Sequence, residues 1–304
     1  MALIAHRGFA GVDPENTVQA VRNASRGWSP EQGQRLADVL RDSVESIEDG
    51  EIVLDLDDDL SELFRDLERR ELPSLAQRQA DMIEVDVMPC GDGDIVVFHD
   101  NQLSSRDEGT RGLTDAEGTV WETDCETVTS AEVLESGETV PLLTEVMDAI
   151  PPEVGVNLEF KANGNMSWDD FADRTLSIAA DYDNEILVSS FAEDAIAAVA
   201  EDYPDVPIAF LFWNDIEAGL EVTDEYDCDA MNVPYNMVQG TPFFSDDIGY
   251  DNVPDGGYAD VDLVSAADER DIELNVWTIQ SWYQADQLVD ADVDGLISDF
   301  PNVL

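Results

Sequence analysis

The segment MIEVDV at residues 82–87 has the alternation of a β-strand with two different faces. Successive side chains of a strand point to opposite sides, so its apolar residues share one face while Glu84 and Asp86 share the other. The segment VNLEFK at residues 156–161 repeats this pattern with Glu159 and Lys161. In a barrel such charged side chains point inward near the strand ends, where an unpaired buried charge is costly. They must therefore pair with one another or bind a metal ion.

Short β-rich runs alternate with amphipathic helical patterns along most of the chain, which is typical of parallel strands joined by helices. Eight such strands favour an α/β fold of the closed (β/α)8 TIM-barrel type, as one domain over residues 1–304, rather than an open doubly wound sheet. The predicted strands are Leu3–Ala5, Met82–Val87, Val154–Phe160, Ile186–Ser190, Ile208–Phe212, Ala230–Val233, Leu274–Ile279 and Gly295–Ser298. The predicted helices include Pro14–Ala24, Leu143–Ile150, Asp169–Tyr182, Glu193–Tyr203 and Tyr283–Asp290.

The run IVVF at residues 95–98 follows the strand at 82–87 too closely for a helix to intervene. The intervening residues 90–93 contain two glycines, so we expect an antiparallel hairpin. This pairing places Asp86 near Val97 or Phe98, and Glu84 near His99.

Two segments do not fit the repeat. Residues 26–80 join the first helix to the second strand. In a barrel such a connection lies on the bottom face, away from the active site. It could also make a subunit contact in a homo-oligomer. We predict two helices in this insertion, with apolar faces formed by Leu36, Val39, Leu40, Ser43, Val44 and Ile47, and by Leu60, Leu63, Phe64 and Leu67. Residues 100–141 leave a strand end on the opposite face, and we expect a loop-rich subdomain near the active-site mouth.

Both histidines of the chain, His6 and His99, stand at the ends of predicted strands beside a charged residue. Histidine is suited to general acid–base catalysis near neutral pH, so both are candidate catalytic residues. Glu84, Asp86 and Glu159 offer three oxygen ligands for a divalent metal ion, Mg²⁺ or Ca²⁺. The absence of a His/Cys cluster disfavours zinc. A ring of ion pairs without metal is the structural alternative.

Cations are rare in this chain, which has 70 Asp+Glu against 14 Lys+Arg and a net charge of −56. Lys161 is its single lysine, and with Arg7 at another strand end it could bind a phosphate group. The overall charge repels nucleic acid and anionic lipid surfaces, so we expect a small-molecule partner. Acidic residues spread along the whole length are typical of proteins from salt-in halophiles, such as halophilic archaea, in which molar salt screens the self-repulsion.

The three cysteines, Cys90, Cys125 and Cys228, are far apart in sequence and form no metal-binding or disulfide pattern, so we expect reduced thiols. No apolar run approaches the ~20 residues of a membrane span. The first candidate motif begins at His6 and leaves no room for a leader peptide before it, which favours a cytoplasmic location.

At these residues the sequence resembles the glycerophosphodiester phosphodiesterase family, which shares a barrel with the phosphatidylinositol-specific phospholipases C. The resemblance covers nearly the whole chain except residues 26–80. The matching motifs are HRG at 6–8, PENT at 14–17, EVD at 84–86, VFHD at 97–100 and EFK at 159–161, with weaker matches at 188–191, 276–279 and 294–299.

The resemblance implies metal-dependent hydrolysis of glycerophosphodiesters to sn-glycerol 3-phosphate and an alcohol. It implies that Glu84, Asp86 and Glu159 hold the divalent ion, and that Arg7 and Lys161 bind the phosphoryl oxygens. His6 is then the base and His99 the acid, while Glu15 and Trp277 lie just behind these groups. The alternatives are a phospholipase-type activity on lysolipid headgroups, which would want an exposed apolar rim at the barrel mouth, and a barrel that binds a metal or a polyol phosphate without turnover.

Overall fold

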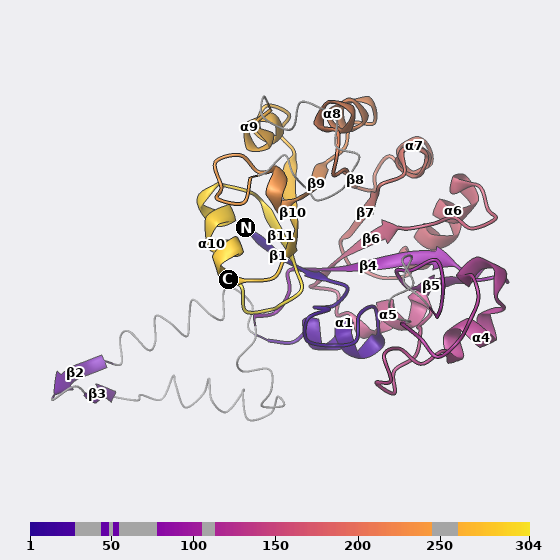
Figure 1. Cartoon of the computed structure of the whole chain (residues 1–304), viewed down its shortest axis with the longest axis horizontal. Coiled ribbons are helices and arrows are strands. Elements are labelled where there is room, and N and C mark those ends of the chain that lie inside the picture. Colours follow the sequence, from indigo (N-terminus) through magenta and orange to yellow (C-terminus); the bar gives the residue numbers. More distant parts are fainter. Residues whose placement is uncertain (28–43, 49–50, 55–77, 105–112, 245–260) are drawn as a thin grey trace.

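The computed structural model describes residues 1–27, 44–48, 51–54, 78–104, 113–244 and 261–304 (Figure 1). A closed barrel of parallel strands forms its centre, as predicted. Strand β1 pairs with β11 on one side and with β4 on the other, which closes the circle. The barrel strands are β1 (Ala2–His6), β4 (Met82–Pro89), β6 (Gly155–Phe160), β7 (Ile186–Ser190), β8 (Ile208–Leu211), β9 (Ala230–Pro234), β10 (Glu273–Ile279) and β11 (Gly295–Ser298).

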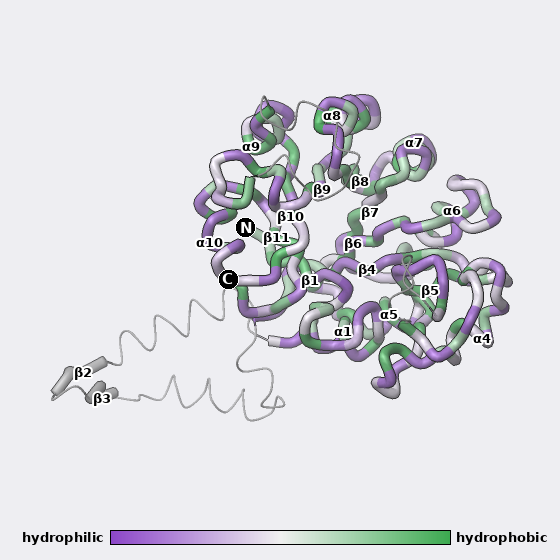
Figure 2. Tube along the Cα trace, viewed as in Figure 1, coloured by the Kyte–Doolittle hydropathy of each residue, from purple (hydrophilic) through white to green (hydrophobic). Residues whose placement is uncertain are grey.

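Helices surround the barrel and bury one face each against it. Figure 2 shows both hydrophilic and hydrophobic stretches along them, as expected for helices with one buried side. They are α1 (Val18–Ala24), α5 (Leu143–Ala149), α6 (Trp168–Ala179), α7 (Glu193–Asp202), α8 (Ile216–Glu225), α9 (Leu263–Asp268) and α10 (Trp282–Asp290). Helix α1 begins later than predicted because Thr17 caps it, accepting a hydrogen bond from the Ala20 amide at 3.2 Å.

The apolar face of β4 packs outward against this helical layer. Ile83, Val85 and Val87 are fully buried in a core that also contains Val146 and Phe171 from helices α5 and α6. The alternation of side chains along β4 is therefore as predicted. Its apolar residues pack against the helices, and its two carboxylates lie on the face toward the barrel interior.

Strand β5 (Ile95–Val97) folds back on β4 as the predicted antiparallel hairpin. Val87 pairs with Val97, and the Phe98 amide donates to the Asp86 carbonyl oxygen at 2.9 Å. Phe98 is thus the residue opposite Asp86, and His99 follows at the point where the hairpin ends.

Residues 100–104 and 113–141 form a small subdomain with its own apolar core, which includes Leu103, Val120, Val128 and Val133. It contains the 3-10 turn η2 (Val120–Glu122) and helix α4 (Cys125–Ser130). Met88 and Phe98 of the hairpin region belong to the same core, so the subdomain is packed against the segment that carries His99.

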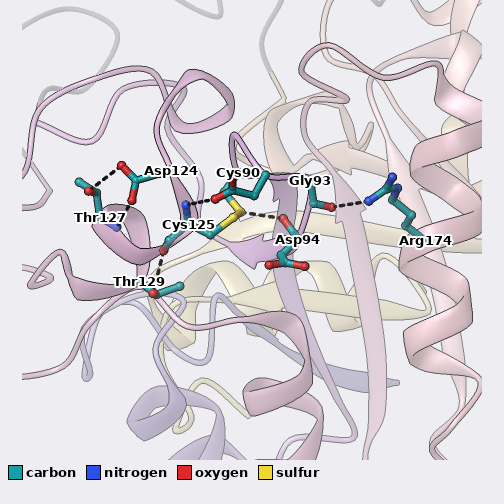
Figure 3. The surroundings of a disulfide bond; sticks show 9 residues. Cys90, Gly93, Asp94, Asp124, Cys125, Thr127, Thr129 and Arg174 are labelled. Carbon is teal, nitrogen blue, oxygen red and sulfur yellow. Dashed lines mark hydrogen bonds between the residues drawn. A yellow bond between two sulfur atoms is a disulfide. The ribbon is translucent and has the colours of Figure 1, made fainter.

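The expectation of reduced thiols is wrong for two of the three cysteines, because Cys90 and Cys125 form a disulfide (Figure 3). Their separation of 35 residues conceals a short distance in space, since the Cα atoms lie 5.3 Å apart. Two hydrogen bonds also join the turn after β4 to the start of α4 and the residues just before it. The Gly91 amide donates to the Thr123 carbonyl oxygen, and the Cys125 amide donates to Asp92 Oδ2. Cys228 is a free thiol, as expected. It is also buried, and burial raises the pKa of its thiol to about 12.

The insertion at 26–80 departs from its prediction where the structure describes it. Strands β2 (Val44–Glu48) and β3 (Glu51–Leu54) form an antiparallel hairpin, so the helical face that included Val44 and Ile47 is wrong there. The intervening Asp-Gly pair, residues 49–50, is a common hairpin-turn sequence that the helical periodicity obscured. The remaining residues of both predicted helical faces lie outside the described residues.

Two hydrogen bonds join the residues at the two ends of the insertion. The Ala80 amide donates to the Ala24 carbonyl oxygen at 3.1 Å, and Gln79 Nε2 donates to the Ser25 carbonyl oxygen at 2.9 Å. In the described part of the chain, no helix combines the length and the apolar character that crossing a membrane requires.

Candidate active site

The end of β1 brings His6 and Arg7 to the carboxyl edge of the barrel. Arg7, Gly8 and Phe9 all have positive φ values, of 50°, 74° and 67°, and this left-handed run reverses the chain directly after His6. Gly8 is needed there, because a Cβ atom would lie 2.8 Å from the Ala20 backbone. The turn aims the Arg7 amide at Glu84 Oε2, which accepts its hydrogen bond at 2.9 Å.

Both histidines are held through the same ring atom by a carboxylate. His6 Nδ1 lies 2.6 Å from Asp299 Oδ1, and His99 Nδ1 lies 2.6 Å from Asp100 Oδ1. A histidine that donates Nδ1–H to a carboxylate keeps Nε2 as the atom that accepts or releases a proton. Both rings line one cavity of about 210 Å³, so the structure brings the two predicted catalytic residues together.

Glu84, Asp86 and Glu159 converge beside the histidines. Asp86 on β4 is opposite Glu159 on β6 in the strand pairing, and Glu84 stands two residues before Asp86 on the same face. One carboxylate oxygen from each residue lies within 4.8 Å of the others. All three are buried, and within the part of the chain that the structure describes, Glu84 Oε1 and Asp86 Oδ1 have no hydrogen-bond partner. Three buried carboxylates with two unsatisfied oxygens could bind a divalent cation such as Mg²⁺ or Ca²⁺.

The surroundings of the two carboxylates on β4 shift their pKa values in opposite directions. Burial raises the pKa of Glu84 well above its ordinary value, and the negative charges of Asp86 and Glu159 raise it further. Burial would also raise the pKa of Asp86, but Arg7, His99 and Lys161 outweigh it and hold that pKa well below its ordinary value. The surroundings therefore favour the ionised form of Asp86 and the protonated form of Glu84.

Arg7 and Lys161 reach the site as predicted but are already paired with carboxylates. Arg7 Nη1 donates to Glu15 Oε1 at 2.8 Å, and its Nε lies 3.1 Å from Asp86 Oδ2. Lys161 Nζ donates to Glu159 Oε1 at 2.6 Å and lies 3.6 Å from Asp86 Oδ1. Burial opposes the charge of both groups, yet these carboxylates raise the pKa of each.

Ion pairs join most of this cluster but leave Glu84 outside the network. The pairs engage Asp86 and one oxygen of Glu159, whereas among the described residues Glu84 accepts only from the Arg7 amide and its Oε1 has no partner. An unpaired buried carboxylate is costly, so Glu84 either takes up a proton or pairs with a further cation.

Several residues at the site were missed as functional residues, although the quoted motifs contain most of them. Asn16 is buried with a φ of 58° and donates from Nδ2 to Asp86 Oδ2 at 2.8 Å. Asp299 and Asp100 orient the histidines, and Gln280 Nε2 donates to the second oxygen of Asp299 at 2.8 Å. Trp277 lines the cavity as a wall rather than lying behind it, together with Asn157, Ser189, Phe191 and Asn232.

The comparisons with known proteins agree with this geometry. The model of the family described as "Glycerophosphoryl diester phosphodiesterase family" matches residues 74–303. The search of curated proteins found no match.

Solved structures with the same fold include three phosphodiesterases. One from Oleispira antarctica, in complex with the product sn-glycerol-3-phosphate, is 20% identical, with a TM-score of 0.65 over 99% of this chain and 94% of that chain. A glycerophosphodiester phosphodiesterase from Thermotoga maritima is 18% identical, with a TM-score of 0.59 over 98% and 94%. One from Agrobacterium tumefaciens is 16% identical, with a TM-score of 0.60 over 100% and 98%.

Proposed function

Because this chain belongs to the glycerophosphoryl diester phosphodiesterase family and is a phosphoric diester hydrolase, we propose that it splits glycerophosphodiesters into sn-glycerol 3-phosphate and an alcohol, with His6 and His99 as its acid–base pair. The observation that carries the proposal is the pair of Nδ1–carboxylate contacts, 2.6 Å each, on two histidines that line one cavity. Two imidazoles that are each held through Nδ1, and so keep Nε2 for proton transfer, suit a reaction that needs one proton taken and one given.

In the proposed mechanism, Nε2 of neutral His6 accepts the proton of the attacking hydroxyl group. Asp299 holds the ring and stabilises the imidazolium that forms. Protonated His99, held by Asp100, gives its Nε2 proton to the leaving alcohol oxygen as the phosphorus–oxygen bond breaks. The attacking oxygen belongs to the glycerol 2-hydroxyl, giving a cyclic phosphate that water then opens, or to water itself.

Charge in the site is supplied by residues at the ends of three strands, β1, β4 and β6. We assign Glu84, Asp86 and Glu159 to a divalent cation, Mg²⁺ or Ca²⁺, which when bound stabilises negative charge on the phosphoryl oxygens. Arg7 and Lys161 bind those oxygens by turning part of their hydrogen-bonding capacity away from Asp86 and Glu159. Glu15 keeps the Arg7 guanidinium in place through the 2.8 Å contact with Nη1.

The test is release of sn-glycerol 3-phosphate from a panel of glycerophosphodiesters at molar salt, with Mg²⁺ or Ca²⁺ added. His6→Ala and His99→Ala should each lower turnover by about 10² or more, as loss of a general acid or base does. Tyr203→Phe, which removes an exposed hydroxyl bonded to Asp173, is the control and should leave turnover unchanged. Near-normal turnover in either histidine variant removes that residue from the mechanism.

Metal binding is tested separately by calorimetry. Glu84→Gln, Asp86→Asn and Glu159→Gln should each weaken binding of Mg²⁺ or Ca²⁺, and the metal that binds more tightly to the unmodified protein identifies the preference. Unchanged affinity in all three variants would mean that the metal site lies elsewhere.

A halophilic source and a cytoplasmic location stay predictions. The net charge of −56 supports the first. The Cys90–Cys125 disulfide counts against the second, because disulfides persist mainly in oxidising compartments. Thiol quantification on protein isolated directly from its native cells, trapped with an alkylating reagent, would decide whether two cysteines are bonded there.

A further inference from the structure

A second group of possible metal ligands lies outside the candidate active site, at the Cys90–Cys125 disulfide (Figure 3). Asp94 lies beside this disulfide, and one oxygen of its carboxylate and the two Sγ atoms all lie within 4.8 Å of one another. We call these three residues the Cys–Asp cluster. Cys90 and Asp94 stand on either side of the turn between β4 and β5, while Cys125 begins helix α4. The cluster therefore joins the barrel hairpin to the small subdomain.

Backbone and side-chain hydrogen bonds hold the members of the cluster in place without using the sulfur–sulfur bond. The Cys90 amide donates to the Asp94 carbonyl oxygen at 2.9 Å, and the Gly93 amide donates to the Cys90 carbonyl oxygen at 2.9 Å. Across the cluster, the Cys125 amide donates to Asp92 Oδ2 at 2.9 Å. Because none of these bonds involves a sulfur atom, reduction of the disulfide removes none of them. The two thiols and the carboxylate therefore stay close together in the reduced protein.

The cluster can be reached from solvent through Asp94. Cys90 is 2% exposed and Cys125 is 9% exposed, whereas Asp94 is an exposed residue. Asp94 lines a second cavity of about 450 Å³, which also has Gly93 and Arg174 in its wall. This cavity supplies an entry path for an ion and a place for a water ligand. The buried sulfur atoms become costly if they lose their protons, unless a cation accompanies them.

The donor atoms of the cluster differ from those of the candidate active site. Two thiolates and one carboxylate are ligands that Zn²⁺ takes in proteins, with water often in the fourth position. Thiolates select a soft ion such as Zn²⁺ over Mg²⁺ and Ca²⁺, which prefer oxygen ligands. The net charge of −56 attracts any cation to the protein surface, so the sulfur atoms decide which ion this place selects.

We propose that the Cys–Asp cluster binds Zn²⁺ after a dithiol has reduced the disulfide, with water as the fourth ligand. Reduction adds two electrons and two protons to the sulfur atoms, and the dithiol becomes a disulfide. Zn²⁺ then releases both thiol protons and forms two Zn–S bonds and one Zn–O bond. Tetrahedral Zn–S bonds of about 2.3 Å place the sulfur atoms about 3.8 Å apart, so each moves by about 1 Å from its position in the disulfide. The metal ion then joins the β4–β5 turn to α4 in place of the covalent bond.

The first test uses Co²⁺ as a spectroscopic probe for Zn²⁺. Dithiothreitol reduces the protein and is removed by desalting without oxygen before Co²⁺ is added. Thiolate-to-cobalt charge-transfer absorption should appear in the reduced protein but not in the disulfide form, and added Zn²⁺ should abolish it. Co²⁺ at the active-site carboxylates gives no such absorption, because those ligands are oxygen atoms. No charge-transfer absorption from protein that contains three free thiols when denatured would overturn the proposal.

Substitutions test whether these three residues are the ligands. Replacing Cys90 and Cys125 together by serine should abolish the charge-transfer absorption, whereas Cys228→Ser should leave it unchanged. Asp94→Asn should weaken binding of Co²⁺ and Zn²⁺ by at least about tenfold, the lower end of what loss of a group behind a metal ligand costs. Glu126→Gln is the matched control, because it removes one negative charge from an exposed side chain directly beside Cys125. Unchanged affinity in Asp94→Asn, or absorption that survives in the double serine variant, would overturn the proposal.

A stability measurement covers the case in which reduction unfolds the protein. Zn²⁺ should raise the Tm of the reduced protein, or restore its folded state as followed by circular dichroism, because binding and folding are linked. The gain should be smaller in reduced Asp94→Asn and unchanged in reduced Glu126→Gln. Zn²⁺ bound at the active-site carboxylates raises Tm equally in all three proteins, so equal gains would overturn the proposal. No readout here depends on hydrolysis of a diester, and the outcome is therefore independent of the proposed function.

Discussion

Asp299→Asn should disable His6 while leaving the cavity intact. Asp299 Oδ1 lies 2.6 Å from His6 Nδ1, and Asp299 Oδ2 accepts from Gln280 Nε2 at 2.8 Å. Asparagine keeps the size of the side chain and can keep one of these bonds. If its carbonyl oxygen continues to accept from Gln280, its amide group faces His6 Nδ1, and that nitrogen can no longer donate. The proton then moves to Nε2, the atom that the proposed base needs free.

The size of the effect follows from the contact that is lost. A hydrogen bond to a charged group contributes about 1.5–3 kcal/mol, and 1.36 kcal/mol corresponds to a tenfold change in rate, so kcat should fall about 10- to 150-fold. Asp299 does not line the cavity, so KM should change less than about threefold. Steady-state release of sn-glycerol 3-phosphate at molar KCl measures both constants. Asp100→Asn makes the same change at His99, where the contact is also 2.6 Å, and should lower kcat by a similar factor.

Acid stability gives the same substitution a second readout. Burial would raise the pKa of Asp299, but the hydrogen bond and charge of His6 outweigh it and lower that pKa below its ordinary value of 3.8. A carboxylate with a lowered folded pKa contributes stability above its unfolded pKa, and this contribution disappears as pH falls through the folded value. The difference in unfolding free energy between the two proteins should therefore shrink on acidification.

Asp148→Asn is the matched control, because Asp148 accepts a 2.8 Å bond from the exposed Tyr182 hydroxyl, away from the cavity. It should leave kcat unchanged. A folded Asp299→Asn protein with kcat within twofold of the unmodified enzyme would refute the assigned role of the Asp299–His6 contact.

Further predictions concern stability and the insertion. Replacing Cys90 and Cys125 together by serine should lower the unfolding free energy by about 2–4 kcal/mol, because their disulfide closes a 35-residue loop; identical denaturant midpoints for both proteins would contradict this. Glu84→Gln should remove a loss of stability that the metal-free protein shows as pH rises above the ordinary pKa of a glutamate, because a carboxylate with a raised folded pKa binds its proton more tightly in the folded state. Equal pH slopes in calorimetric melts of the two proteins would count against it. Replacing residues 29–78 by a short Gly/Ser link should preserve KM and turnover, because the backbones of Ala24 and Ala80 are already joined by a hydrogen bond. If the insertion makes a subunit contact, light scattering should show a changed oligomeric state. A folded variant with tenfold lower turnover would mean that the insertion reaches the active-site mouth. Lowering KCl from molar to 0.1 M should lower Tm, because screening of the net charge of −56 is lost, and an unchanged Tm would contradict the halophilic interpretation.

The barrel could be predicted because its signals are local and repeated. Each strand is a short apolar run, and the alternation in β4 already separates helix-facing residues from Glu84 and Asp86. The same local logic predicted the β4–β5 hairpin and hence the approach of His99 to the carboxylates. It failed for the insertion, where apolar spacing over residues 44–47 fits a helix and a strand about equally well.

Contacts between residues far apart in the sequence could not be predicted from such local patterns. The Cys90–Cys125 bond depends on how the subdomain folds back on β4, and a spacing of 35 residues carries no such information. Asp299 and Asn16 belong to recognisable motifs, but among 70 acidic residues only the folded structure distinguishes the one beside His6.

The contact between His6 and Asp299 joins the first strand of the chain to the residue just after the last one, 293 positions later. On the ribosome, His6 is made early but does not have the Asp299 carboxylate to orient it until residue 299 has been made. The barrel cannot close before then either, because β1 needs β11 as its neighbour. In the proposed mechanism, the base is therefore oriented at a single late step. A nascent or prematurely terminated chain that lacks residues 295–304 would leave His6 without its partner, even if Glu84, Asp86 and Glu159 were already in place.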